Sequence, residues 1–159
     1  MEPLKMERSA ADNRYLHRDF HKTLDLGLAY IAKRYGQASV EEYIRRVAEV
    51  YFAPVLEEIK KDGLGALARH IEKTYEAEEA SGACHTRIAD GVLTVRIDDS
   101  PALSHFKKIG YQASPYFVQT TDTMNRVIAE HAGLSYHMDF YDDETGECEC
   151  TFALKEGKA

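Results

Sequence analysis

The sequence contains little cysteine, no tryptophan and no long apolar run. Three cysteines among 159 residues are an odd number and too few for a disulfide scaffold, which favours a reducing, cytoplasmic location. No apolar stretch approaches the roughly 20 residues that a membrane span needs. Residues 1–12 are polar and lack the apolar segment of a signal peptide, so we expect them to form a flexible N-terminus.

Blocks of basic residues are also absent. Twenty Lys and Arg stand against 27 Asp and Glu, which gives a formal net charge of −7. Nucleic acids and anionic membranes attract clustered positive charge, so neither is an expected partner. With 44% hydrophobic and 30% charged residues, the composition is that of a folded chain. The length suits a single domain over residues 13–159.

Apolar residues at three- and four-residue steps predict helices in the first half of the chain. A helix from about Asn13 would end near Gly36 and bury one stripe, made of Leu16, Phe20, Leu24, Leu28, Ile31 and Tyr35. Ser39 and Glu42 form a capping-box pattern that predicts the start of a second helix. That helix would turn six residues inward: Val40, Tyr43, Ile44, Val47, Val50 and Tyr51.

Pro54 predicts a kink or break in this second helix at about residues 50–54, because proline removes a helical N–H and crowds the preceding turn. Helical spacing resumes up to Asp62-Gly63. A third helix is expected over residues 64–79.

The apolar period then changes to two, which predicts strands. Asp90-Gly91 is a strong hairpin signal. Three residue pairs would lie opposite each other on one face: Ile88 with Leu93, Thr86 with Val95, and Cys84 with Ile97.

A short helix over residues 101–108, with Ser100 as its cap, a loop over 110–115 and a helix over 116–131 follow. A second hairpin has its turn at residues 142–146, with Leu134, Tyr136, Met138 and Phe140 on one face of its first strand. Its second strand would carry Cys148, Cys150, Phe152 and Leu154 on one face. The sequence therefore predicts an α+β fold, with N-terminal helices packed on an antiparallel sheet of about four strands made of two hairpins.

His17 and His21 project from the same side of the first helix, at the edge of its apolar stripe. Such a pair can act as a general base with its helper or as two metal ligands. A catalytic zinc would need a third ligand, and the candidates are Asp19, Asp25, His105 and His137. The alternative is two boundary histidines that are hydrogen-bonded to neighbouring groups.

Other candidate residues lie in the second half of the chain. Thr121 and Asn125 are neighbours on the expected 116–131 helix, and Arg126 could hold a carboxylate as a bidentate fork. The alternative is a solvated helix face. Ser100 and His105 could form a nucleophile and base, although a helix cap and a partly exposed histidine are the simpler interpretation. Cys84, Cys148 and Cys150 are expected to be buried as small hydrophobic residues.

Several short segments together carry a family resemblance: residues 17–21, Tyr30, 35–36, 42–44, 51–54, 100–105, 110–111, 120–121 and Asn125. They resemble the L-2-amino-thiazoline-4-carboxylic acid hydrolase-like family over residues 15–152. The resemblance implies hydrolytic opening of a small cyclic amidine that carries a carboxylate. Where that family has two cysteines, this chain has Ser100 and either Val118 or Gln119, which favours changed chemistry or binding alone.

These observations lead to one function hypothesis and two alternatives. In the first, His17 or His21 activates water, His105 protonates the leaving atom and Asn125 stabilises the tetrahedral centre. Thr121, Arg126, Ser100 and Tyr51 would contact the substrate. The alternatives are a small-molecule binding module and a metal enzyme that uses His17 and His21; the sequence leaves the cofactor unknown. A homodimer is the default assembly, although no interface pattern marks one.

Overall fold

The computed structural model describes the backbone of residues 14–155 and the side chains of residues 20–155. The expected flexible segment 1–12 lies outside the described residues. The helices are α1 (Arg14–Tyr35), α2 (Gln37–Tyr51), α3 (Ala53–Asp62), α4 (Leu64–Ala77), α5 (Pro101–Lys108) and α6 (Asp122–Ala132), with short 3₁₀ turns η2 (Ser81–Ala83) and η3 (Phe117–Thr120). The strands are β1 (Cys84–Ala89), β2 (Val92–Ile97), β3 (Leu134–Tyr141) and β4 (Cys148–Leu154).

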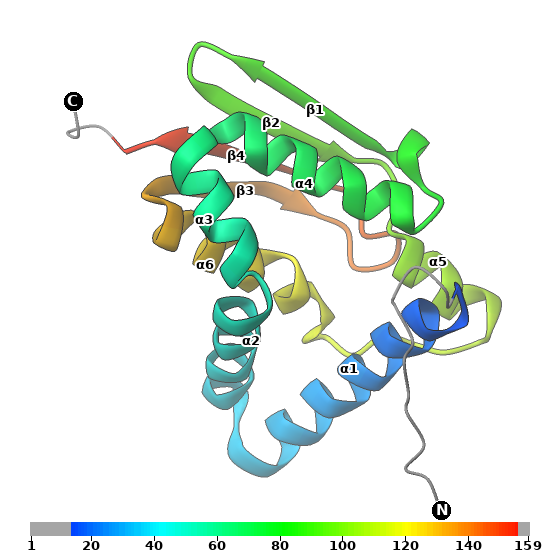
Figure 1. Cartoon of the computed structure of the whole chain (residues 1–159). Coiled ribbons are helices and arrows are strands. Elements are labelled where there is room, and N and C mark those ends of the chain that lie inside the picture. Colours follow the sequence, from blue (N-terminus) through cyan, green and yellow to red (C-terminus); the bar gives the residue numbers. More distant parts are fainter. Residues whose placement is uncertain (1–13, 156–159) are drawn as a thin grey trace, which may run out of the picture.

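The four strands form one antiparallel sheet in the order β1-β2-β4-β3 (Figure 1). The hairpins β1–β2 and β3–β4 are joined through pairing of β2 with β4. All three residue pairs predicted across Asp90-Gly91 are present, including Ile88 opposite Leu93. The α+β prediction, with helices packed on a sheet of two hairpins, is therefore confirmed.

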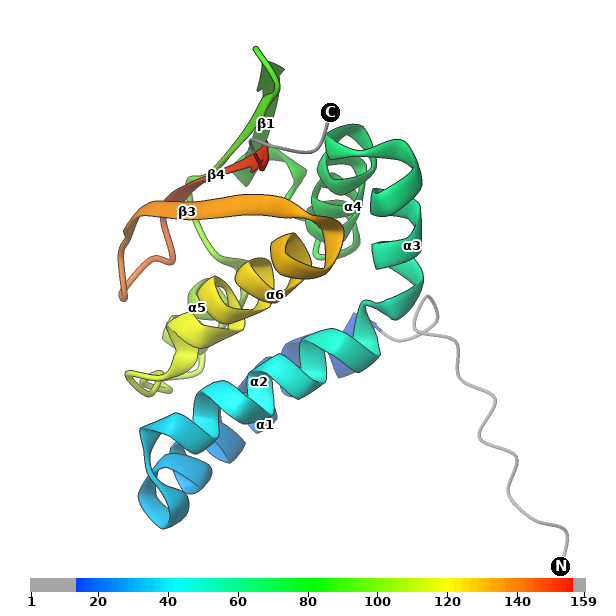
Figure 2. The same cartoon turned by 90° about the vertical axis from the view of Figure 1, so that its left-hand side faces the viewer.

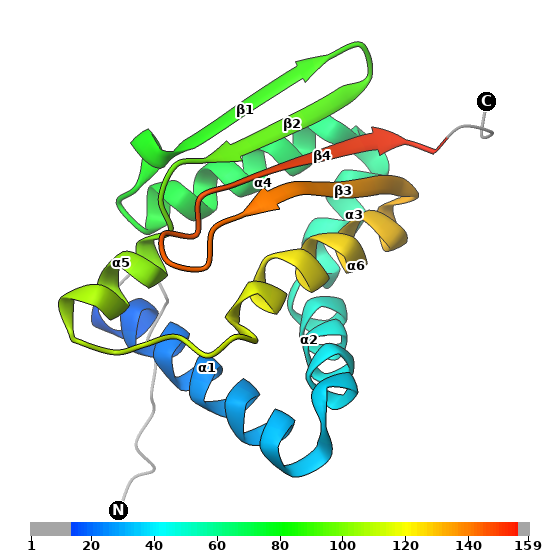
Figure 3. The same ribbon diagram turned by 180° about the vertical axis from the view of Figure 1, so that it is seen from behind.

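Helices α3, α4 and α6 pack on one face of the sheet and enclose the largest core. This core combines alternate residues of β2 and β4 with one side of each helix, and its fully buried members include Leu67, Leu93 and Phe152. Cys148 and Cys150 are buried there and Cys84 is half-buried, so the predicted burial holds in full for the first two. Seen from behind, the sheet lies in front of α4 (Figure 3).

Helices α1 and α2 form the layer farthest from the sheet (Figure 2). α1 packs on α2 and α5, and α2 packs on α6. A second, smaller cluster lies in this layer and consists of Leu24, Leu28, Val40 and Ile44. A third cluster joins α5 to η3 through Ala102, Leu103, Phe106 and Phe117.

The helix boundaries follow the predicted glycine and proline positions, but one predicted cap is wrong. α1 ends before Gly36, whose φ of 91° lets α2 begin at once. Ser39 lies inside α2 and donates to the carbonyl oxygen of Tyr35 at 3.2 Å instead of capping a helix. The chain breaks at Phe52, and Pro54 sits in the first turn of α3, where its missing N–H leaves no unmade hydrogen bond.

Two further local predictions are wrong in part. The expected helix over 116–131 is divided at Thr121 into the 3₁₀ turn η3 and α6, which ends as predicted at Gly133. In β3, a register shift between Met138 and Phe140 turns Phe140 off the expected face. Its ring instead lies 5.7 Å from the Arg96 guanidinium.

Several side chains predicted to point inward are exposed. They are Phe20 and Tyr35 of α1, Tyr43, Val50 and Tyr51 of α2, and Leu154 of β4. In α2 the fully buried stripe is narrow and comprises Val40, Ile44 and Ala48. Among the described elements, α2 packs mostly on α1 and α6, with further contacts to α3 and η3, and its remaining side is exposed.

Candidate functional site

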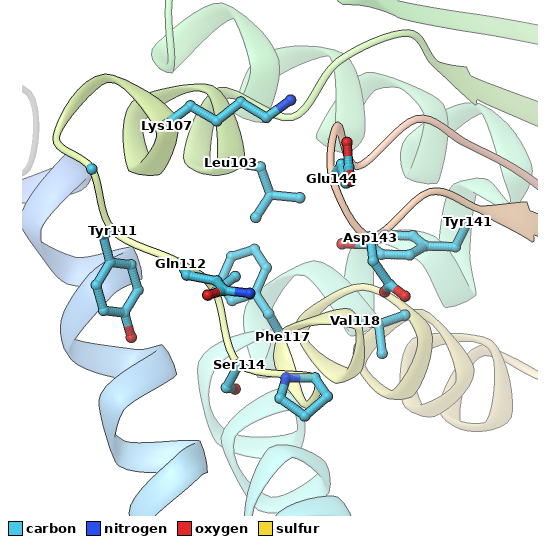
Figure 4. A pocket seen from close by; sticks show the side chains of 13 residues that line it. Leu103, Lys107, Tyr111, Gln112, Ser114, Phe117, Val118, Tyr141, Asp143 and Glu144 are labelled. Atoms are coloured by element: carbon cyan, nitrogen blue, oxygen red, sulfur yellow. The ribbon is translucent and has the colours of Figure 1, made fainter.

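A cavity of about 570 Å³ lies between α5, the segment 110–118 and the β3–β4 turn (Figure 4). Pockets of 300–1,000 Å³ are typical of small-molecule sites. Its lining residues come from three separate parts of the chain: Leu103, Lys107, Gly110, Tyr111, Gln112, Ala113, Ser114, Pro115, Phe117, Val118, Tyr141, Asp143 and Glu144.

The apolar side of the cavity is built by α5 and η3. Ser100 caps α5 by accepting a hydrogen bond from the Leu103 N–H at 3.5 Å, and Pro101 occupies the first turn. The helix then buries Leu103 and Phe106. The Phe106 ring meets the ring of Phe117 edge-on with centroids 5.2 Å apart, which fixes η3 against α5.

The charged side chains stand at the mouth. Lys107 extends from α5, and Asp143 and Glu144 come from the β3–β4 turn (Figure 4). All three residues are exposed. Within residues 20–155, none of these charges is engaged in an ion pair, so they are available to a ligand.

The β3–β4 turn is held in shape by the Asp142 carboxylate. It accepts hydrogen bonds from the N–H groups of Thr145 at 2.7 Å and Glu144 at 2.9 Å, and from the Thr145 hydroxyl at 2.9 Å. These hydrogen bonds, led by the backbone N–H of Thr145, lower the pKa of Asp142. The turn that carries Asp143 and Glu144 is therefore ordered before any ligand binds.

The same turn is attached to the start of α5. The Ser100 N–H donates to the Thr145 carbonyl at 2.8 Å. Gly146 has a φ of 72°, and a Cβ at this position would collide with the Cβ of Ser100 and approach Leu103 Cδ1 to 3.2 Å. Glycine is thus required where the turn meets the helix.

The opposite wall of the cavity is anchored on α1 by a buried carboxylate. Asp25 is fully buried. It accepts hydrogen bonds from the Tyr111 hydroxyl at 2.6 Å, the Ser114 N–H at 2.9 Å and the Ser114 hydroxyl at 2.6 Å. Burial, with the hydrogen bond to Asp25, raises the pKa of Tyr111 to about 12. Figure 4 shows Tyr111 directed toward α1.

Among the residues whose side chains are described, the cavity lining contains none of the seven candidates predicted from the sequence: His21, Tyr51, Ser100, His105, Thr121, Asn125 and Arg126. The side chain of His17 lies outside the described residues. His21 is half-buried, and its Nε2 lies 3.1 Å from Oε1 of Glu78, which follows α4. His105 is half-buried on α5 without lining the cavity, and Tyr51 is 70% exposed.

The α6 candidates have separate surroundings. Arg126 is exposed and pairs with Asp122, as expected for a solvated helix face. Asn125 donates its N–H to the Thr121 carbonyl at 3.0 Å, and its side chain lies near Tyr136. The structure therefore does not bring Asn125, Thr121 and His21 together around this cavity, and their catalytic roles stay predictions.

Metal binding by the histidine pair is likewise a prediction. Among the residues whose side chains are described, no group of three His, Cys, Asp or Glu could hold a metal ion. The side chain of His17 lies outside these residues. Within the described part of the chain, no helix is long and apolar enough to cross a membrane.

The sequence does not reveal the site, because two of the three parts of its lining lie in segments without a repeating pattern. Residues 110–115 are predicted only as a loop and residues 142–146 only as a turn. One signal was present: Asp25 lies between Leu24 and Leu28 on the buried side of α1, where a carboxylate needs hydrogen-bond donors.

Comparison with known proteins adds no assignment: no protein-family model, no curated protein and no solved structure matches this chain.

Proposed function

We propose that this protein binds a small molecule bearing both a positive and a negative charge in the cavity between α5, segment 110–118 and the β3–β4 turn. The observation that carries the proposal is that charges of both signs stand at the mouth of a cavity with an apolar floor. Among the described residues, these charged side chains form no ion pair. Lys107 would hold the anionic group. Asp143 and Glu144 would hold the cationic group, and the body of the ligand would rest on Leu103 and Phe117.

This ligand class agrees with the family resemblance. A cyclic amidine that carries a carboxylate has both charges within one small ring system. Val118, one of the two positions at which that family's second cysteine would fall, lines the cavity, and Ser100, at the other cysteine position, contacts the turn that forms its edge. These two positions support the same cavity as the binding site.

Binding can be tested by calorimetry with L-2-amino-thiazoline-4-carboxylic acid and with its analogue that lacks the carboxylate. We expect the full compound to bind at least about tenfold more tightly, equivalent to 1.4 kcal/mol. Lys107→Gln should remove this difference, whereas the matched control Lys108→Gln on the same helix should keep it.

The acidic side is tested by the double variant Asp143→Asn and Glu144→Gln, with Glu42→Gln on α2 as the control. Loss of affinity for the amidine in the double variant alone supports the proposal. Equal affinity for both probes, or no binding of either, would contradict it.

Hydrolysis is a second proposal that rests on the same resemblance and on the presence of carboxylates at the cavity. Asp143 or Glu144 would accept a proton from the water that adds to the amidine carbon, and Gln112 would hydrogen-bond the tetrahedral centre. The protonated carboxyl would then return this proton to the ring atom whose bond to that carbon breaks. Turnover should then be lost in Asp143→Asn or Glu144→Gln and retained in His21→Ala. Loss of turnover in His17→Ala and His21→Ala would favour the histidine mechanism instead.

A further inference from the structure

The outer side of the α1–α2 helix pair exposes an unusual amount of apolar surface. Among the described residues, eleven large hydrophobic side chains are exposed, and seven of them belong to α1 or α2. We define the outer face of the pair by Leu26 and Tyr30 of α1 and Tyr43 and Val50 of α2, with Phe20 and Tyr51 at its margins.

Helical spacing shows that these side chains share a face. Leu26 and Tyr30 are four residues apart, on the side of α1 opposite the buried Asp25 and Leu28. Tyr43 and Val50 are seven residues apart on α2 and form one stripe.

The stripe on α2 also points away from the rest of the molecule. Its side toward α6 is marked by Arg45, which donates to Glu130 at 2.6 Å, and by the buried Ala48. Figure 2 shows α1 and α2 together as the outermost layer, with α6 between them and the sheet. Both stripes therefore face solvent on the same side of this layer.

The exposed area matches what a dimer requires. The six side chains are between 41% and 70% exposed. At these exposures each presents roughly 100 Å², or roughly 600 Å² for one copy, given about 150–250 Å² for a complete large side chain. Two copies would bury roughly 1,200 Å², the lower limit of a specific interface. The patch of one copy therefore lies at the upper end of the range of about 300–600 Å² that the largest apolar patch of a typical monomer covers.

We infer that the outer face of the α1–α2 pair is the interface of a two-fold symmetric homodimer. A symmetric interface places the same patch against itself, and two helix pairs with apolar stripes pack as a four-helix layer. The patch suits a second copy of this chain because the apolar area that two copies would bury reaches the lower limit of a specific interface. This inference does not depend on the cavity or its ligand.

The oligomeric state of the full chain tests the inference. We expect analytical ultracentrifugation, from micromolar to submillimolar protein, to show a dimer for the wild type. Leu26→Glu and Val50→Glu should each raise the dimer Kd by about 100-fold or more, since two charges enter one symmetric apolar interface. Ile88→Glu on β1, an equally exposed apolar position outside the patch, should leave the Kd unchanged.

Circular dichroism serves as the control for folding. Because Leu26, Val50 and Ile88 are all exposed, we expect each variant to keep the helix content of the wild type. Hydrogen exchange supplies a second measurement: dilution should increase exchange in peptides over residues 26–30 and 43–51 and not in β1. A wild-type monomer at every concentration would overturn the inference. So would a dimer that survives both glutamate variants or that Ile88→Glu dissociates.

Discussion

The sheet end and the helical end of this molecule bury their side chains by different means. At the sheet end, β2 and β4 with α3, α4 and α6 enclose one continuous apolar core of fifteen buried residues. At the helical end, two clusters of four buried residues each are present, and the buried carboxylate of Asp25 joins α1 to the segment 111–114. The sheet end rests mainly on its large apolar core, whereas the helical end combines small apolar clusters with hydrogen bonds to a fully buried carboxylate.

This difference is relevant to the candidate site. The cavity lies where the two ends meet, with α5, η3 and segment 110–118 on the helical side and the β3–β4 turn on the sheet side. Small clusters and loop hydrogen bonds leave space that a continuous core would fill. A binding cavity is therefore expected at this junction and not beneath the sheet.

The same leucine-to-alanine substitution at each end should give the largest change in stability. Leu93 in β2 and Leu28 in α1 are both fully buried. We expect Leu93→Ala to reduce the free energy of unfolding by about 4 kcal/mol and Leu28→Ala by about 2.5 kcal/mol, because a small cluster can collapse into the space. Urea denaturation measures both. Equal losses would show that the helical end is packed as rigidly as the core.

Removing the buried carboxylate tests the dependence on hydrogen bonds. Asp25→Ala should cost about 2 to 3 kcal/mol in unfolding free energy, since the Ser114 N–H and two hydroxyls lose their acceptor. Hydrogen exchange should increase over residues 110–116. Thr123→Val, which removes one buried hydroxyl in α6 while keeping its shape, is the control and should cost less than about 1 kcal/mol. If Asp25→Ala left the free energy of unfolding unchanged, the carboxylate would not anchor segment 111–114 to α1.

Two glycines distinguish backbone strain from crowding at the junction. Gly146→Ala introduces both a strained φ and a collision with Ser100, so we expect a loss of about 2 kcal/mol and weaker ligand binding. Gly133→Ala has a similar φ of 74° but open space around its Cβ, so about 1 kcal/mol is expected. Thermal unfolding measures the stability of both variants. An equal loss of stability in Gly146→Ala and Gly133→Ala would show that the contact between the β3–β4 turn and α5 adds no stability.

Titration of the tyrosines at alkaline pH should give the smallest change in stability, and it reports on both ends of the molecule. Burial raises the pKa of Tyr75, Tyr136 and Tyr141 at the sheet end, and the pKa of Tyr111 rises to about 12 at the helical end. An unfolded tyrosine ionises near pH 10, so the folded state keeps protons that the unfolded state has lost. Stability is complete below about pH 10 and falls as the pH rises toward 12.

Tyrosinate absorbance should therefore increase in two steps, and Tyr111→Phe should reduce the later step. A single step near pH 10 for all ten tyrosines would contradict the buried positions of these side chains.

Local sequence signals predicted much of the fold. Asp90-Gly91 predicted the register of the first hairpin, because a two-residue turn leaves one pairing that keeps the apolar residues on one face. Gly36 and Gly133 marked helix ends, and Pro54 marked the break between α2 and α3. The candidate site was not predictable in this way, since Lys107, Ser114 and Glu144 lie on elements that no short-range pattern relates.

The sequence by itself determined the α+β class, the hairpin register and most helix boundaries, because these depend on turn chemistry and on apolar periods within a few residues. The tertiary structure alone decided which apolar stripes are covered and where a cavity remains. Tyr43 and Val50 fit a buried stripe in sequence, yet they are exposed because the helices described next to α2 pack on its other sides. The sequence places Asp25 on the buried side of α1, yet only the contact between α1 and segment 111–114 supplies the donors that make its burial stable.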